Sequence, residues 1–200
     1  MRETGDWNAW KVAPMDTNEL RLPQGSSARA QNMATEHVFE TAIVFAMRRD
    51  TVPLAIVTRR MRDQLDRRGT NRPAAARAQL ATFDALLARA RGDRNSAISL
   101  LQSAEAAADS SPPIGPPHLL LLHELLGSVL FDAGRFADAA AAYTRGLALT
   151  PNRSSLLLGL ARAGQRSGNS SAVEDAYAHL QKNWAHADSE VRATASGGRQ

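Results

Sequence analysis

The chain has 200 residues, of which 44% are hydrophobic and only 5% are aromatic, and its formal net charge is +4. This length allows one ordinary domain or one short repeat array, and the composition suffices for a buried core. The absence of cysteine excludes disulfides and thiolate metal sites. No apolar run approaches the roughly 18 residues of a membrane-spanning helix, and the first residues contain no apolar signal core. We therefore expect a cytoplasmic protein.

The first 73 residues predict an irregular segment followed by one helical hairpin. Residues 1–33 are expected to be irregular, because prolines and a Gly-Ser-Ser run punctuate them. From Ala34 onward, apolar residues recur at four-residue spacing, which predicts a helix. Thr51 is the expected N-cap of a second helix, which ends before a break at 69–73. These helices form a degenerate hairpin over 34–73.

The rest of the chain predicts three more hairpins. Four prolines and a glycine within residues 110–117 cannot form a helix interior, so this segment is interpreted as an insertion in a repeat region spanning 74–185. Trp184 is expected to cover the end of the array, and the polar tail 186–200 is expected to fray. The predicted helices are 74–91, 96–109, 118–133, 136–149, 153–167 and 170–185.

The fold class predicted from this order is all-α, an α-solenoid of about four antiparallel helical hairpins. The residues that end the first helix of each hairpin support a repeat. They are Asp50, Gly92, Gly134 and Gly168, which are separated by 42, 42 and 34 residues. The last value is the length of a known two-helix repeat unit. Insertions of eight residues would account for the two longer values.

The third hairpin carries the most informative pattern of small and bulky residues. Gly127 and Ala139 are small enough for two helices to cross closely, Tyr143 would fill the space beside them, and Pro151 ends the unit. This segment closely resembles the tetratricopeptide repeat (TPR) family. The resemblance extends over 118–184, is weaker over 74–109 and is weakest over 34–68. The fourth unit departs from the family at Gly164, where a large residue is usual, and at Ala185, where proline is usual.

A closer resemblance lies in the runs 115–117, 123–127 and 157–163, which are similar to the C-terminal part of uncharacterised bacterial TPR-containing proteins. This resemblance implies a repeat scaffold and no established activity. It also implies that the chain is the C-terminal portion of a longer repeat protein. Such a portion would expose an apolar face at its first hairpin, so we expect it to self-associate or to be marginally stable.

The candidate binding surface follows from the same resemblance, because repeat arrays commonly bind partners on the concave surface formed by their first helices. The mixture of charged, polar and apolar residues there suits an extended protein or peptide partner better than a metabolite, and an ordinary solvated face is the alternative. Glu124 and Ser128 replace the lysine and asparagine of the carboxylate-clamp subset, which argues against binding of a chaperone tail. The inward positions are His37, Glu40, Met47, Arg48, Gln79, Arg89, Glu124, Phe131, Asp132, Ser155, Arg162 and Arg166.

A second hypothesis is nucleic-acid binding, because the positive charge is concentrated in the first part of the chain. Residues 1–77 hold 13 Lys/Arg and 9 Asp/Glu, whereas residues 78–200 hold 11 of each. Arginine clusters contact phosphates, but arginines also cover apolar helix surfaces with their stems, and no aromatic residue interleaves with these. The cluster comprises Arg59, Arg60, Arg62, Arg67, Arg68, Arg72 and Arg77.

A third hypothesis is that the chain is the C-terminal fragment of a larger enzyme, to which His123 or Glu124 contributes. His118 and His123 are five residues apart and fall on different faces of a helix, whereas a zinc site prefers spacings of three or four. A structural role for His123 is therefore the expectation, with no metal and no cofactor. The leading hypothesis is a non-catalytic scaffold that mediates protein–protein interaction.

Overall fold

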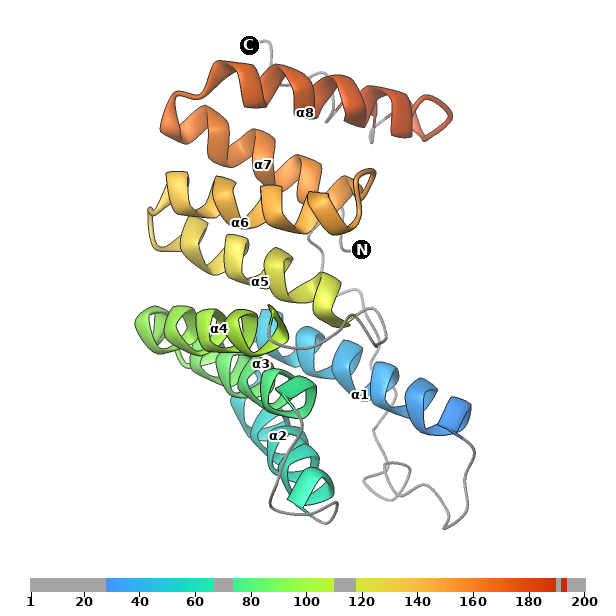
Figure 1. Ribbon diagram of the computed structural model, residues 1–200, viewed down its shortest axis with the longest axis vertical. Helices are drawn as coiled ribbons and strands as arrows, with labels where there is room; N and C mark the ends of the chain where they lie inside the picture. The colour runs from blue at the N-terminus through green and yellow to red at the C-terminus, as the bar shows by residue number, and fades with distance from the viewer. Residues whose placement is uncertain (1–27, 67–73, 110–117, 190–191, 194–200) are drawn as a thin grey trace. The chain divides into compact units, whose positions relative to one another are not determined.

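The computed structural model describes residues 28–66, 74–109, 118–189 and 192–193. These residues form eight α-helices and no strand, which confirms the predicted all-α class (Figure 1). No helix among them is both long and apolar enough to cross a membrane. The helices are α1 (Ala28–Arg48), α2 (Thr51–Asp66), α3 (Ala74–Ala90), α4 (Arg94–Asp109), α5 (His118–Asp132), α6 (Phe136–Leu149), α7 (Ser154–Ser167) and α8 (Ser170–Asn183).

The chain divides into two compact units between Leu119 and Leu120. Helices α1–α4 belong to the first unit, and α6–α8 with nearly all of α5 belong to the second. The boundary lies in the first turn of α5, inside the region 74–185 that the sequence analysis treats as one run of repeats. Each unit is described by itself below.

Most predicted helix boundaries lie within two residues of the observed ones, and the main exception is α1. It begins at Ala28, so the prediction of irregular structure is wrong for residues 28–33. That stretch lacks the apolar spacing on which the prediction depended, but it is rich in alanine, arginine and glutamine, which are strong helix formers. Helix α2 begins at Thr51, which is therefore its first helical residue and not its N-cap. The predictions for 1–27, 69–73, 110–117 and 194–200 lie outside the described residues.

The same turn closes the first helix of all four hairpins. Its key residue has a left-handed backbone, with φ of 60° at Arg49, 84° at Gly92, 76° at Gly134 and 78° at Gly168. The next N–H donates to the carbonyl five residues earlier, at 2.9 to 3.0 Å in each case, which is the Schellman arrangement. The residue equivalent to the three glycines is thus Arg49, not Asp50. The correct separations are 43, 42 and 34 residues.

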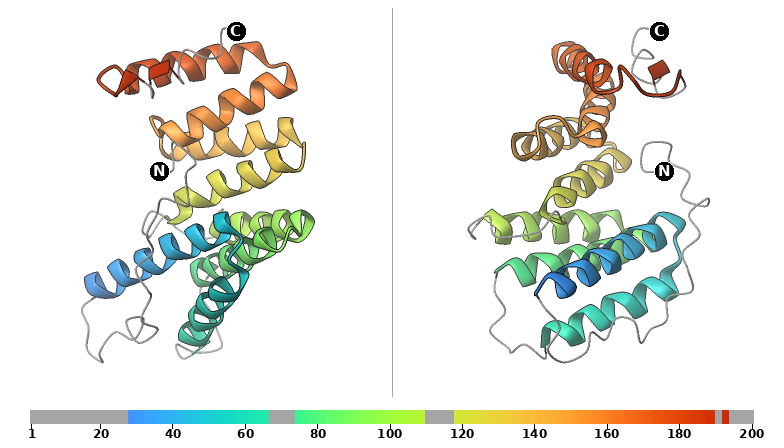
Figure 2. Two further views of the ribbon diagram at one scale, coloured as in Figure 1. Left: turned by 180° about the vertical axis from the view of Figure 1, so that it is seen from behind. Right: turned by 90° about the vertical axis from the view of Figure 1, so that its right-hand side faces the viewer.

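In the first unit, α1 packs on both α2 and α3, α2 packs on α3, and α3 pairs with α4 (Figure 2). Helix α1 therefore contacts both its own partner α2 and α3, the first helix of the next hairpin. Phe39 of α1 and Phe83 of α3 form the centre of this contact, with ring centroids 5.2 Å apart and an edge-to-face angle of 89°. Both rings are almost fully buried.

In the second unit, Tyr143 of α6 lies between two glycines from neighbouring helices. A Cβ atom built on Gly127 of α5 would stand 2.6 Å from the Tyr143 ring, and one built on Gly159 of α7 would stand 2.5 Å from it. Ala139 is fully buried beside them. The close approach predicted for Gly127 and Ala139 is therefore present, and Gly159 extends it to the next hairpin.

The end of the second unit is closed by an apolar cluster of α7 and α8. Trp184, which follows α8, is 6% exposed and packs with Leu157, Ala161, Ala176 and Leu180. The indole covers apolar surface at the last hairpin, as expected from its position.

Candidate functional site

An ion pair links α5 and α7, the two first helices of the second unit, between the middle of α5 and the start of α7. Arg153, which precedes α7, donates from Nε and Nη2 to Oε2 of Glu124 on α5, at 2.9 Å in both cases. The two side chains are 26% and 20% exposed, so this pair is only partly open to solvent. Glu124 is thus already occupied by a partner within the chain.

Near the last residues of α5 and α7, two aromatic rings and an arginine stack together, and one of the rings begins α6. The ring centroids of Phe131 and Phe136 are 5.2 Å apart at an interplanar angle of 67°. The guanidinium carbon of Arg166 lies 4.5 Å from the centre of the Phe136 ring, within the range of a cation–π contact. Arg162 lies one turn earlier on α7 and is exposed.

Four of the predicted binding residues lie in pairs, Glu124 with Phe131 on α5 and Arg162 with Arg166 on α7, each pair on one face of its helix, and together they define a candidate surface. We call it the α5–α7 face and define it by Glu124, Phe131, Arg162 and Arg166. Ser155, half-buried, and Asp132, exposed, belong to the same two helices. The face presents one arginine that is exposed and one that is held over an aromatic ring.

The other predicted binding residues belong to the first unit. Glu40 is exposed on α1, whereas Met47 and Arg48 near the end of that helix are half-buried. On α3, Gln79 and Arg89 are half-buried, and Nε2 of Gln79 is a buried nitrogen without a hydrogen-bond partner in the described part of the chain. The side chain of His37 lies outside the described residues.

The histidines do not form a metal site in the part of the chain that the structure describes, where no group of three or more His, Cys, Asp or Glu side chains comes together. His123 is 7% exposed, and its Cβ lies 3.0 Å from the place where a Cβ on Gly146 of α6 would stand. It therefore packs as a core residue between α5 and α6, as expected. The side chain of His118 is not among those described.

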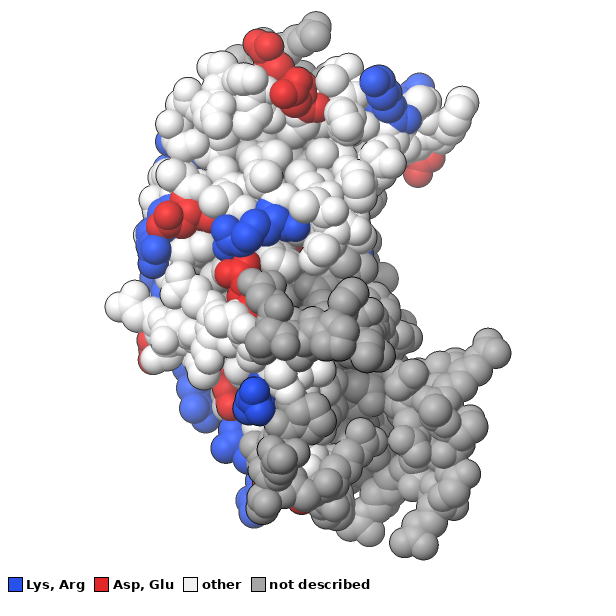
Figure 3. Space-filling view, in the orientation of Figure 1, with Lys and Arg blue, Asp and Glu red and all other residues white. Residues whose placement is uncertain are grey.

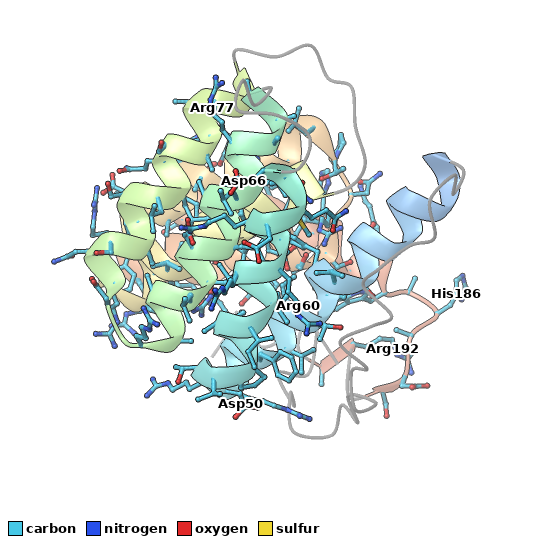
Figure 4. The ribbon with its side chains drawn as sticks, turned by 90° about the horizontal axis from the view of Figure 1, so that it is seen from below. Asp50, Arg60, Asp66, Arg77, His186 and Arg192 are labelled. Atoms are coloured by element: carbon cyan, nitrogen blue, oxygen red, sulfur yellow. The ribbon has the colours of Figure 1, made fainter. Side chains whose placement is uncertain are left out.

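The predicted basic cluster is dispersed where it is described. Arg62 of α2 donates from Nη2 to both carboxylate oxygens of Asp84 on α3, at 2.6 and 2.9 Å. Figure 4 shows Arg77 at the end of the hairpin near Asp66, whereas Arg60 lies toward the opposite end, which Asp50 marks. Arg67, Arg68 and Arg72 lie outside the described residues. The described members thus do not form one continuous surface.

In the described part of the first hairpin, where the sequence predicts an exposed apolar face, α1 is covered and α2 is not. The apolar side chains of α1 between Val38 and Met47 are buried or half-buried. The large hydrophobic side chains that are exposed among the described residues are Val52 and Ile56 on α2 and Leu149 on α6. The two α2 residues are four apart in a helix that the sequence predicts, so their spacing alone could have placed them on one face.

No protein-family model matches the chain, and no curated protein matches it.

Proposed function

We propose that the chain is a TPR-like, non-catalytic scaffold that binds a protein or peptide partner along the α5–α7 face. The observation that carries this proposal is the position of Tyr143 between Gly127 and Gly159. It brings α5, α6 and α7 close together and presents the two first helices side by side. Such pairs of first helices form the binding surfaces of helical repeat proteins.

The chemistry of the α5–α7 face supports a peptide partner. Arg162 offers an exposed guanidinium, which can donate two parallel hydrogen bonds to a carboxylate or to backbone carbonyls. Phe131 and Phe136 offer an aromatic surface with Arg166 fixed above one ring. Aromatic residues and arginine are the residue types that most often dominate binding energy at protein interfaces.

The test is affinity capture from lysate with the full chain, followed by identification of the captured proteins by mass spectrometry. The double charge reversal Arg162→Glu and Arg166→Glu is expected to remove a specific partner that the unchanged chain retains. The matched control is Arg145→Glu with Arg192→Glu, which changes the net charge equally at exposed positions away from this face. Capture that is unchanged by the first pair, or reduced equally by both pairs, would refute the proposal.

A further inference from the structure

The first two turns of α2 carry an exposed apolar pair. Val52 is 72% exposed and Ile56 is 44% exposed. Because they are four residues apart, the two side chains lie on the same face of the helix. The opposite face of α2 is buried through Leu54, Val57 and Met61, so the helix is apolar on both sides at this end.

The ion pair between Arg62 and Asp84 fixes how α3 is aligned along α2, and so which residue of α3 lies level with this apolar pair. Helices α2 and α3 run antiparallel in both views of Figure 2, and these two side chains join them at 2.6 Å. Ala55 precedes Arg62 by seven residues and Arg91 follows Asp84 by seven, which is two turns, or about 10.5 Å, along each helix. Arg91 therefore comes level with Ala55, beside Val52 and Ile56.

Arg59 follows Ile56 by three residues on the same face of α2, Arg49 lies two residues before α2 begins, and Arg94 begins α4, three residues after Arg91. All four arginines are exposed, and their side chains make no hydrogen bond or ion pair with the described part of the chain. The remaining described arginines of this unit differ, since Arg62 pairs with Asp84 and the others also have partners. We define the α2 patch as Val52, Ile56, Arg49, Arg59 and Arg91.

Arginines outnumber carboxylates at this end of the first unit. The exposed aspartates nearby are Asp50, Asp63 and Asp93. Asp50 and Asp93 directly precede α2 and α4, where the positive end of a helix dipole offsets their charge, and Asp93 also accepts a hydrogen bond from the Ser96 N–H at 3.0 Å. Figure 3 shows Lys and Arg side chains gathered along the left edge of this unit.

We propose that the α2 patch binds an acidic amphipathic segment of a partner protein. The apolar side chains of the segment would pack on Val52 and Ile56, and its carboxylates would pair with the surrounding arginines. An apolar centre with a charged rim is the usual anatomy of a protein interface. Nucleic acid suits the patch less well, because its bases stack on aromatic rings and the centre of this patch is aliphatic.

This inference does not depend on the proposed function, since the α2 patch and the α5–α7 face share no residue. The test measures binding of the full chain to a fluorescent amphipathic helical peptide with Leu at its apolar positions and Glu or Asp at all others. We expect saturable binding with a dissociation constant of about 100 μM or tighter, weakening as salt rises. A peptide of equal charge with Gln in place of Leu is expected to bind at least about tenfold more weakly.

Two double variants test the two chemical components of the patch. Val52→Gln with Ile56→Gln removes the apolar centre while keeping good helix formers, and Arg59→Glu with Arg91→Glu reverses the rim. Each is expected to weaken binding at least about tenfold. The matched controls are Leu149→Gln and Arg145→Glu, which change an exposed large hydrophobic and an exposed arginine of α6 in the second unit. Both controls are expected to bind as the unchanged chain does.

Four results would overturn the inference. The first is peptide binding that does not saturate up to about 1 mM peptide. The second is equal affinity for the Leu and Gln peptides. The third is a loss of peptide affinity in the control variants as large as that in the patch variants. The fourth is tighter binding of a single-stranded RNA or of anionic lipid vesicles than of the peptide.

Discussion

The position of Tyr143 predicts that alanine at Gly127 or Gly159 destabilises the second unit, although alanine is the better helix former. A methyl group on Gly127 would stand 2.6, 2.7 and 2.8 Å from three ring carbons, whereas carbon atoms normally approach to about 3.5–4.0 Å. The ring would have to retreat by about 1 Å. Gly159 blocks this retreat, since a methyl group there would already be 2.5 Å from the ring.

The expected magnitude is the difference between two terms. Overpacking costs about 1–3 kcal/mol, and replacement of glycine by alanine in a helix gains about 1 kcal/mol. Because the opposite glycine position blocks retreat of the ring, the overpacking cost should lie in the upper part of this range, about 2–3 kcal/mol, so each substitution is expected to lower the free energy of unfolding by about 1–2 kcal/mol. In a Tyr143→Leu background the clash is relieved, so Gly127→Ala is expected to become neutral or stabilising.

The assay is urea unfolding of the full chain, followed by the fluorescence of Trp184 after Trp7 and Trp10 are replaced by Phe. Trp184 is buried in the second unit and reports on its unfolding. Ser128→Ala, next to Gly127 on α5, serves as the control and is expected to change stability little. If Gly127→Ala and Gly159→Ala are as stable as the unchanged chain, the ring is not confined between the two helices and the reasoning is wrong.

Two further predictions concern the hairpin turns. Gly168→Ala is expected to destabilise the chain by about 1 kcal/mol and so to lower its thermal unfolding midpoint, because φ at this position is 78°. A Cβ there would meet no atom within 4 Å, so the cost comes from the backbone conformation alone. An unchanged midpoint would contradict this prediction. Hydrogen bonds from Ser96, chiefly from its side chain and also from its N–H, lower the pKa of Asp93. The stability that Asp93 contributes is therefore present above its unfolded-state pKa and is lost as pH falls through its lower folded-state pKa. Asp93→Ala is expected to lower the free energy of unfolding at neutral pH and to make it depend less on pH in the acid range. If the free energy of unfolding of the variant and of the unchanged chain depends on pH in the same way, this prediction is wrong.

Much of the fold could be predicted because its determinants are local in sequence. Helical periodicity, proline positions and the glycine turns located most helix ends, and the pairing of Gly127 with Ala139 anticipated the close crossing around Tyr143. Arg49 could not be identified as a turn residue in this way. A non-glycine residue rarely adopts a positive φ, so its sequence carries no signal for it.

The candidate surfaces were harder to predict because they depend on the register between helices. Arg62 and Asp84 are 22 residues apart, so their ion pair is known only from the structure. This contact distinguishes Arg62 from Arg59, whose side chain has no partner among the described residues. The sequence grouped both arginines in one basic cluster. Likewise, Glu124 was expected to face a partner, whereas Arg153 already engages it.

The left-handed turn at Arg49 has a consequence for how this molecule balances stability against surface chemistry. The equivalent position is glycine in the other three hairpins, where the same conformation is free of side-chain strain. An arginine in this conformation lowers the free energy of unfolding by about 1 kcal/mol. The same arginine places an exposed guanidinium at the edge of the α2 patch. Folding stability alone would favour glycine at this position.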